Sequence, residues 1–207
     1  MEDAHPYLIL VMLWVAYAVL HSLLASQRVK RTLVSAMGRL SRYYRLLYSL
    51  VAVVGLLPIL FYSALIPRRI LLPAGWNDVL TIAGLIAATY GVIIIRLAFK
   101  QYSFSQFIGL QQAKLGEEQE SFSREGVLAL VRHPLYTGSI LILLGFWLFS
   151  PTLSNLITVS ILILYVLIGI RLEERKLVEQ YGNAYLEYQK EVPMLVPRRG
   201  SLKQLRQ

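Results

Sequence analysis

Residues 133–170 read HPLYTGSILILLGFWLFSPTLSNLITVSILILYVLIGI and contain no Lys, Arg, Asp or Glu. At about 1.5 Å per residue, one continuous helix of this stretch would be roughly 57 Å long, whereas the hydrocarbon core of a bilayer is about 30 Å thick. The stretch must therefore fold back on itself. Its turn-forming residues lie at 150–155 (SPTLSN), which predicts a membrane hairpin whose two ends return to the same face.

The rest of the chain is also apolar. It has 207 residues, of which 56% are hydrophobic, and a mean hydropathy of +0.54, well above that of a soluble domain. Further uncharged runs occur at 6–26, 46–66 and 79–95. Together with the hairpin they predict an all-α integral membrane protein with about five transmembrane helices.

We expect one membrane domain covering residues 1–207. It would consist of three N-terminal spans in 1–100, a cytoplasmic connector in 101–132, the hairpin in 133–171, and an amphipathic helix with a basic tail in 172–207. The connector is expected to contain a short interfacial helix and loops. The first span lacks the basic segment and cleavage site of a secretory signal, so we expect it to be retained.

Basic residues are concentrated between the first two spans and in the C-terminal tail, and the net charge is +9. The first group comprises Arg28, Lys30, Arg31, Arg39, Arg42 and Arg45, and the second comprises Arg198, Arg199, Lys203 and Arg206. Because basic loops stay inside, this pattern predicts an external N-terminus and a cytoplasmic C-terminus, as in a bacterial inner membrane. It also favours contact with anionic membrane lipid over a nucleic-acid partner.

A zinc site, a disulfide and a cysteine nucleophile are not expected. The chain has no cysteine, and its three histidines, His5, His21 and His133, are far apart in the sequence without ligand spacing. The candidates for a functional site are two clusters of polar residues at the ends of the hairpin.

The first cluster contains Arg132, His133 and Tyr136, with Pro134 at the expected first helical turn and Gly138 two residues beyond Tyr136. A cationic and a polar side chain at a helix N-terminus fit an anionic or aromatic ligand, and glycine permits close backbone approach. The alternative is a positively charged membrane anchor followed by an N1 proline.

The second cluster contains Glu173 and Glu174 at the end of the last span. Carboxylates near a helix C-terminus oppose its dipole, so they need a cationic partner. Arg171, Arg175 or Lys176 of the same helix would serve, or else a carboxylate receives the positive group of a ligand.

After the hairpin, hydrophobic and tyrosine residues recur at helical spacing. They are Leu177, Val178, Tyr181, Tyr185 and Tyr188. This spacing predicts an amphipathic cytoplasmic helix, interrupted at Gly182 and ended by Pro193 and Pro197. Such a tyrosine stripe serves packing or interfacial anchoring more often than ligand binding.

Taken together, these elements resemble the signature of a known membrane methyltransferase family. The matching segments, in order, are Arg132-His133-Pro134-Leu135-Tyr136-Thr137-Gly138, Glu173-Glu174, Tyr181-Gly182 with Tyr185 and Tyr188, and Val192-Pro193-Met194-Leu195-Val196-Pro197. The family includes isoprenylcysteine carboxyl methyltransferase, phospholipid methyltransferases and methanethiol S-methyltransferase.

The N-terminal half is more similar to the bacterial methanethiol-methylating branch and its relatives associated with nitric oxide reduction. This likeness rests on His21-Ser22-Leu23-Leu24-Ala25-Ser26 with Lys30, on Tyr44-Arg45, and on residues 104–110. The prenylcysteine branch typically has an arginine four residues before the first glutamate. Here that position is Gly169, and the nearest arginine is Arg171.

The resemblance implies S-adenosylmethionine as methyl donor. It would be held by Arg132, His133, Pro134, Tyr136 and Gly138 from one cluster, and by Glu173, Glu174 and Tyr185 from the other. Within this set, Arg132 would bind the carboxylate of the donor, and a glutamate would bind its ammonium or ribose hydroxyls.

His21 is a candidate base or hydrogen-bonding group on the acceptor side if its span packs against the hairpin; the alternative is a packed or interfacial histidine. Arg171 is the second candidate catalytic residue. The acceptor would be a small or lipophilic molecule, most simply a thiol. Alternatives are a prenylcysteine-type carboxylate, a phospholipid amine, or a non-enzymatic membrane protein of the nitric-oxide-associated type. A channel or transporter is a weak alternative, because no charged residue lies mid-membrane in any expected span.

Overall fold

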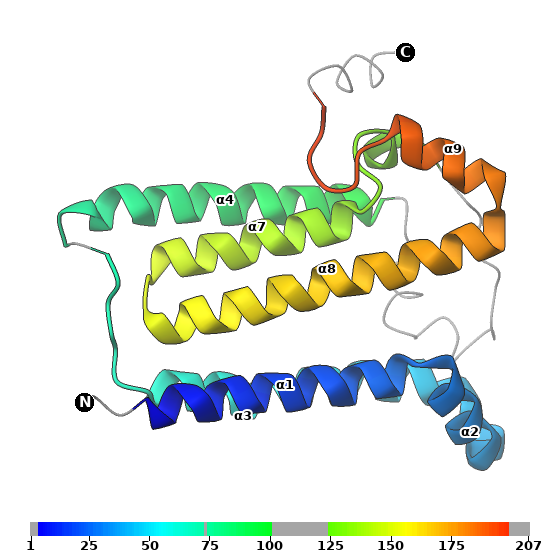
Figure 1. Cartoon of the computed structure of the whole chain (residues 1–207), viewed down its shortest axis with the longest axis horizontal. Coiled ribbons are helices and arrows are strands. Elements are labelled where there is room, and N and C mark those ends of the chain that lie inside the picture. The colour runs from blue at the N-terminus through cyan, green and yellow to red at the C-terminus, as the bar shows by residue number, and fades with distance from the viewer. Residues whose placement is uncertain (1–3, 73, 101–123, 199–207) are drawn as a thin grey trace. The chain divides into compact units, whose positions relative to one another are not determined.

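The computed structural model describes residues 4–72, 74–100 and 124–198, which fold into helices joined by short turns (Figure 1). The α-helices are α1 (His5–Ala25), α2 (Gln27–Met37), α3 (Tyr44–Leu65), α4 (Asn77–Ala98), α7 (Pro134–Phe149), α8 (Leu153–Tyr181) and α9 (Asn183–Glu191). Short 3₁₀ helices cover Gly38–Tyr43, Ala74–Trp76 and Gly126–Ala129. The predicted all-α class is confirmed.

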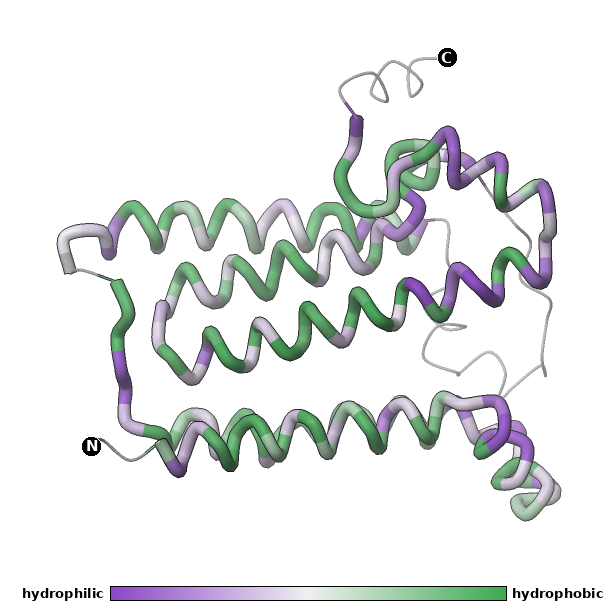
Figure 2. The backbone as a smooth tube through the Cα atoms, viewed as in Figure 1, coloured by the Kyte–Doolittle hydropathy of each residue, from purple (hydrophilic) through white to green (hydrophobic). Residues whose placement is uncertain are grey.

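Among the described residues, four helical segments are long and apolar enough to cross a bilayer. They are α1, α4, α8 and the stretch 27–65, whose last part is α3. The fifth apolar helix, α7, has 16 residues, or about 24 Å of helix. In Figure 2, hydrophobic residues predominate along these helices, and hydrophilic residues gather on the C-terminal turns of α8 and on α9. The chain is therefore an integral membrane protein, whose described residues include four long candidate spans and one shorter apolar helix.

The predicted hairpin at 133–170 is confirmed. Helix α7 ends at Phe149 and α8 begins at Leu153, so the reversal occurs within the predicted turn. Helix α8 continues without a break to Tyr181. At Gly182 the backbone adopts a φ of +56°, which favours glycine, and α9 starts there in a new direction. The predicted interruption is thus confirmed, although the first part of the amphipathic segment extends the membrane helix.

The contacts divide the described residues into two compact units. Unit 1 contains 4–69 and 152–161, and unit 2 contains 70–72, 74–100, 124–151 and 162–198.

In unit 1, tyrosine hydroxyls join α1 to α3. Tyr17 donates to the carbonyl of Ala52 (2.9 Å), and Tyr44 donates to that of Leu24 (2.6 Å). The buried Trp14 indole donates to the hydroxyl of Thr158 at 3.0 Å, which ties the start of α8 to α1. Side-chain hydrogen bonds therefore link the helices of unit 1.

Helix α2 covers a stretch that the sequence analysis treats only as a basic loop. Its N-cap is Ser26, whose side chain accepts a bond from the Val29 amide. Val29, Leu33 and Met37 recur every four residues, so they lie on one face of an amphipathic helix. Three of the basic residues after the first span, Arg28, Lys30 and Arg31, therefore lie on a helix.

In unit 2, α4 and α7 touch through glycines. Gly91 and Gly138 face each other, and so do Gly84 and Gly145, seven residues along each helix. A Cβ added at Gly138 would lie 2.6 Å from the Gly91 carbonyl oxygen, and one at Gly145 would lie 2.6 Å from that of Gly84. The two backbones therefore approach closely enough to exclude any side chain at these positions.

Of the predicted connector, residues 101–123 lie outside the described residues, and with them the expected interfacial helix and the family likeness at 104–110. The described part, 124–131, forms the 3₁₀ helix Gly126–Ala129, which leads directly to Arg132.

Candidate functional site

The two predicted clusters meet in unit 2. Both nitrogens on one edge of the Arg132 guanidinium, Nε and Nη2, lie 2.7 Å from Oε1 of Glu174. The Arg132 side chain is 10% exposed and that of Glu174 is 15% exposed, so the ion pair is largely shielded from solvent. The hairpin thus brings residues 42 positions apart into direct contact.

Arg132 also binds the end of α9. Its Nη1 donates to the backbone carbonyls of Gln189, at 3.1 Å, and Val192. One guanidinium therefore joins the start of α7, the end of α8 and the end of α9. Arginine suits this position because its N–H groups diverge in a fixed plane, whereas a lysine would present a single point charge.

His133 and Tyr136 complete the cluster from α7. His133 is the N-cap residue of α7 and is 5% exposed, and its Nε2 lies 3.1 Å from Glu174 Oε1. Tyr136 donates its hydroxyl to Oε2 of Glu173 at 2.8 Å. The rings of His133 and Tyr136 lie 5.7 Å apart at an angle of 42°.

The two glutamates have different surroundings. Glu174 is approached by Arg132, His133 and, at 3.5 Å, the hydroxyl of Tyr185. The recorded partner of Glu173 among the described residues is Tyr136. Compensation of Glu174 thus comes across the fold, from α7, rather than from the basic residues of α8. Glu173 remains the carboxylate with more capacity to accept further hydrogen bonds.

Tyr185 and Tyr188 form the base of the site. Both are 2% exposed, and they pack with Val192 against Leu177, Val178 and Tyr181. Burial raises the pKa of Tyr185 well above its ordinary value, and the charge of Glu174 acts in the same direction. Tyr185 therefore remains a neutral hydrogen-bond donor beside Glu174. Most of the tyrosine stripe serves packing, and Tyr185 also reaches the polar cluster.

The C-terminal segment 193–195 secures the start of α7. The amides of Arg132 and His133 donate to the carbonyls of Pro193 (3.0 Å) and Met194 (3.2 Å). The hydroxyl of Thr137 donates to the carbonyl of Leu195 at 2.9 Å. The proline-rich end of the signature thus fixes the position of the Arg132-His133 pair.

Pro134 and Gly138 are both buried in the packed part of α7. Pro134 occupies the first turn of α7, as predicted, and is fully buried. Gly138 is buried against Gly91 of α4. The close backbone approach predicted at Gly138 is therefore made to a neighbouring helix.

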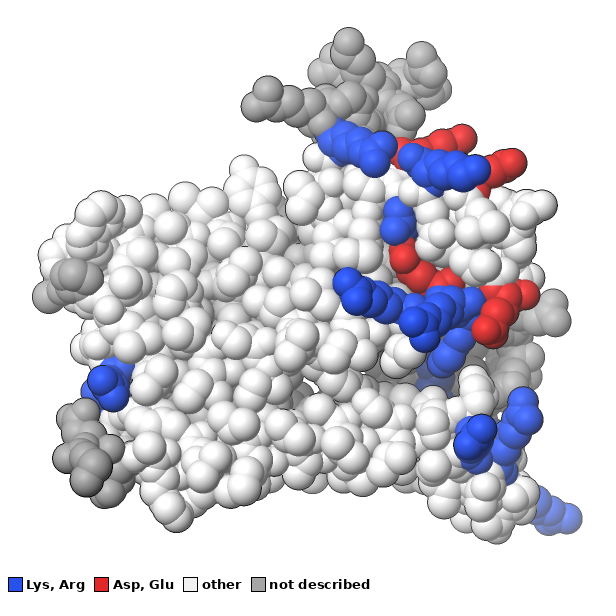
Figure 3. Space-filling model, viewed as in Figure 1, with Lys and Arg blue, Asp and Glu red and all other residues white. Residues whose placement is uncertain are grey.

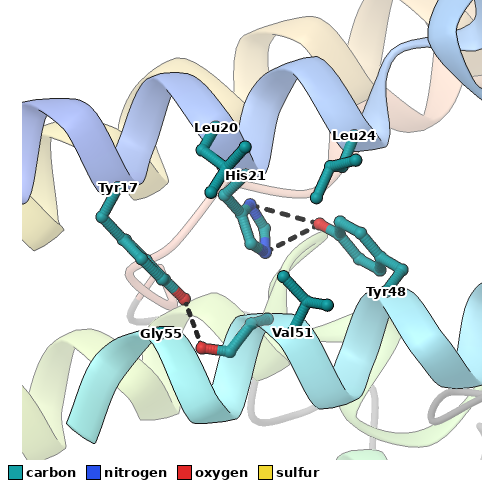
Figure 4. A pocket seen from close by; sticks show the side chains of 8 residues that line it. Tyr17, Leu20, His21, Leu24, Tyr48, Val51 and Gly55 are labelled. Carbon is teal, nitrogen blue, oxygen red and sulfur yellow. Dashed lines mark hydrogen bonds between the residues drawn. The ribbon is translucent and has the colours of Figure 1, made fainter. Parts of the chain in front are cut away.

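The two candidate catalytic residues have contrasting surroundings. His21 lies in unit 1, where the hydroxyl of Tyr48 is 2.7 Å from its Nε2 (Figure 4). Arg171 is exposed on α8.

Charged residues gather over the last turns of α8 and over α9, as Figure 3 shows.

Contacts that the sequence pattern does not predict also hold the site together. Tyr188 donates to the carbonyl of Leu128 at 2.6 Å, and Arg124 donates to that of Ala184. The guanidinium of Arg124 also lies over the Tyr188 ring, 5.5 Å from its centroid. The sequence signal for Arg124 is its position shortly before Arg132. A single arginine in a segment of mixed polarity does not by itself predict a contact with the site.

Comparison of the sequence with known proteins identifies the family of this chain. The sequence profile described as NnrU protein matches residues 8–201. The chain belongs to the NnrU family. No solved structure shows significant similarity to it.

Several curated relatives carry the name methanethiol S-methyltransferase. One from a Pseudomonas species is 37% identical over 128 residues, which are 58% of this chain and 48% of the relative. One from Crocosphaera subtropica is 36% identical over 113 residues, which are 51% of this chain and 42% of the relative. Methanethiol S-methyltransferase 1 of Bradyrhizobium diazoefficiens is 29% identical over 208 residues, covering 97% of this chain and 70% of the relative.

These matches confirm the predicted likeness to the methanethiol S-methyltransferases. The chain aligns with about half the length of the first two relatives.

Proposed function

We propose that this protein is an integral membrane S-methyltransferase that transfers the methyl group of S-adenosylmethionine to a small thiol. The family signature and the names of the relatives support the reaction class. The single observation that carries the proposal is the convergence of Arg132, His133, Tyr136, Glu173 and Glu174 on one site at the end of the hairpin.

The residues present fit the donor molecule. S-adenosylmethionine carries an ammonium group and ribose hydroxyls, which require an acceptor, and an aromatic base, which requires a flat surface. The Glu173 carboxylate accepts a hydrogen bond from Tyr136, and the Tyr136 ring lies 5.7 Å from the His133 ring. In our proposal Glu173 accepts the hydrogen bonds of the donor, and His133 and Tyr136 contact its nucleoside.

The contacts of Arg132 favour a role different from the expected binding of the donor carboxylate. Four of its N–H contacts are made to Glu174 and to two carbonyls near the end of α9. Binding the carboxylate of the donor would require Arg132 to give up some of these contacts. We therefore assign Arg132, with Glu174 and Tyr185, to holding the site in place. Pro134 and Gly138 would shape it from the α7 backbone.

When bound, S-adenosylmethionine supplies an electrophilic methyl group, whose transfer to a thiolate neutralises one positive and one negative charge. A site that excludes water favours such charge-neutralising transfer over the separate hydrated ions. Buried residues of the chain, including His133, Pro134, Tyr185 and Tyr188, limit water at this site. Their burial therefore supports the reaction as well as the fold.

Loss of the thiol proton requires a base or water near the acceptor. His21 and Arg171 remain our candidates on the acceptor side. His21 is the more suitable proton acceptor, because arginine does not deprotonate in proteins. Arg171 would instead stabilise the acceptor as a thiolate.

For orientation, we propose an external N-terminus and a cytoplasmic donor site. The supporting observation is the run of basic residues on α2 and the following 3₁₀ helix, combined with the alternation of the spans. S-adenosylmethionine is made in the cytoplasm, so this orientation gives the site access to its donor.

The test is a methyl-transfer assay with full-length protein in detergent. Radiolabelled S-adenosylmethionine is supplied with methanethiol, with a prenylcysteine analogue, or with phosphatidylethanolamine. The proposal predicts label in dimethyl sulfide and little in the other two products. Glu173→Gln should reduce the rate at least about a hundredfold, since a charge-assisted contact to the donor is lost. Transfer to either of the other acceptors in preference to methanethiol would overturn the thiol assignment, and no transfer to any acceptor would overturn the enzyme assignment.

A further inference from the structure

Unit 1 contains two adjoining pockets that follow α3. The first lies between α1 and α3, around His21 and Tyr48, whose side chains point toward each other in Figure 4. The second extends toward α2 and includes Leu33 and Met37. Leu24, Tyr48 and Val51 line both pockets. The two pockets therefore form one groove, which we call the α1–α3 groove.

Exposed apolar side chains form much of this groove. Leu20 is 51% exposed, and Leu47 and Val51 are each 46% exposed. A groove of this kind beside membrane helices fits a hydrocarbon chain, because lipid is the solvent of this part of the protein. The groove thus matches the tail of an amphiphile in its chemistry.

The polar atoms of the groove lie close to the end of α1. His21 is about one helical turn before Ala25, the last residue of that helix. The hydroxyl of Tyr48 lies 2.7 Å from His21 Nε2. Amphipathic rings of this type are typical of the level where the hydrocarbon region meets the polar headgroups. An amphiphile in the groove would have its polar groups at this end.

The residues beyond that end are basic. No acidic residue occurs between Asp3 and Asp78, whereas six basic residues fall on α2, the following 3₁₀ helix and the start of α3. They are Arg28, Lys30, Arg31, Arg39, Arg42 and Arg45. Basic residues near a membrane surface favour the binding of anionic lipid.

We propose that the α1–α3 groove binds one phospholipid with an anionic headgroup. One acyl chain lies along α3 between the apolar residues of both pockets, and the phosphate lies at the basic end formed by α2. Two observations support a lipid over a second protein chain: exposed apolar side chains line the groove, and the six basic residues beyond it lie in a segment of sequence without acidic residues. Lipid retention is measured without a methyl donor or acceptor, so its failure is distinguishable from failure of the proposed methyl transfer.

The test measures lipid retention by native mass spectrometry. Full-length protein in detergent is mixed with dioleoyl phosphatidylglycerol or with dioleoyl phosphatidylcholine. We expect one phosphatidylglycerol molecule to be retained, with an affinity at least about tenfold higher than that for phosphatidylcholine. Equal retention of the two lipids would overturn the proposal.

A matched pair on α3 locates the site. Val51 lines the groove, and Val53 is 58% exposed on another face of the same helix. Val51→Trp should reduce phosphatidylglycerol retention at least about tenfold, whereas Val53→Trp should leave it unchanged. Leu47→Trp serves as the second groove variant if Val51→Trp lowers the melting temperature. Equal retention by the two variants of a matched pair would contradict the proposed position.

A second matched pair tests the headgroup. Lys30→Gln with Arg31→Gln should reduce the preference for phosphatidylglycerol at least about tenfold. Arg68→Gln with Arg69→Gln removes the same charge after the other end of α3 and should have no effect. If the spectra instead show a dimer without lipid, and Val51→Trp dissociates it, the occupant is a second copy of the chain and the proposal is wrong.

Discussion

Two helix pairs of this protein are held by opposite means. In unit 2, α4 and α7 meet backbone to backbone at Gly84, Gly91, Gly138 and Gly145. In unit 1, α1 and α3 are joined by long side chains, such as Tyr17 on the carbonyl of Ala52. Glycine contacts leave no space between helices, whereas tyrosine bridges separate them and leave the α1–α3 groove.

The difference corresponds to what each pair does in our account. His133 and Tyr136 lie at the start of α7, so a closely packed α7 fixes their positions relative to Glu173 and Glu174. Preorganised polar groups of this kind are what a binding or catalytic site requires. The α1–α3 pair instead provides a groove for a lipid chain. Four substitutions test this contrast, in decreasing order of expected effect.

The largest effect is expected for Arg132→Gln in unit 2. The substitution leaves the shielded carboxylate of Glu174 without its cation and removes the contacts to the end of α9. Breaking such a pair costs about 3 to 5 kcal/mol. Thermal unfolding in detergent should show a markedly lower melting temperature, and Arg132→Lys should restore only part of it, because lysine lacks the divergent N–H groups. An unchanged melting temperature for Arg132→Gln would show that the pair does not hold unit 2 together.

The second effect concerns the glycine contacts. In Gly145→Ala the added Cβ meets the Gly84 carbonyl oxygen at 2.6 Å and the Ala88 amide nitrogen at 2.8 Å, and both are backbone atoms that cannot move away independently. Overpacking of this kind costs about 1 to 3 kcal/mol. Gly169→Ala is the control, because nothing lies within 4 Å of its added Cβ. That variant should be as stable as the parent or more stable by up to about 1 kcal/mol. Equal stability of the two variants would argue against close α4–α7 packing.

A smaller effect is expected in unit 1 for Tyr17→Phe. This change removes one hydrogen bond, of 2.9 Å, to the carbonyl of Ala52 and retains the ring. Interhelical hydrogen bonds in membranes contribute about 0.6 kcal/mol on average. A loss above about 2 kcal/mol in the same unfolding experiment would mean that the tyrosine bridges are as important as the glycine contacts.

The smallest effect is expected for Gly55→Ala, the glycine substitution in unit 1. Its Cβ would meet the Tyr17 ring at 3.2 Å, and that ring is part of a side chain that can shift. The gain in helix propensity, about 0.5 to 1 kcal/mol, offsets the crowding. We expect no measurable change in melting temperature, in contrast to Gly145→Ala. A drop as large as that of Gly145→Ala would remove the distinction between the two helix pairs.

The overall fold was accessible from sequence because membrane thickness limits helix length. An uncharged stretch from 133 to 170 has few alternatives to a hairpin, and the hairpin then requires Arg132 and Glu174 to be near each other. The interruption at Gly182 was accessible for a similar reason, since glycine is the residue that adopts a positive φ without strain.

The individual contacts were less accessible. Gly138 was recognised as a position of close backbone approach, but pattern alone does not distinguish a ligand from Gly91 of α4. Arg132 contacts Glu174, whereas Tyr136 contacts Glu173. Which glutamate each residue contacts depends on side-chain directions, and sequence spacing does not specify these. Helix α2 is not predicted from the sequence, because its arginines and lysine are typical of a basic loop beside a span. The recurrence of Val29, Leu33 and Met37 is the signal for this helix.

The central claim is that the end of the hairpin holds the methyl donor through Glu173, and isothermal calorimetry of S-adenosylmethionine with full-length protein in detergent tests it most directly. We predict binding by the parent protein, a loss of at least about tenfold in affinity for Glu173→Gln and His133→Ala, and unchanged affinity for Glu179→Gln, which alters an exposed carboxylate of the same helix. If the parent protein does not bind S-adenosylmethionine, or if Glu173→Gln and His133→Ala bind it as tightly as Glu179→Gln does, the proposed donor site is contradicted.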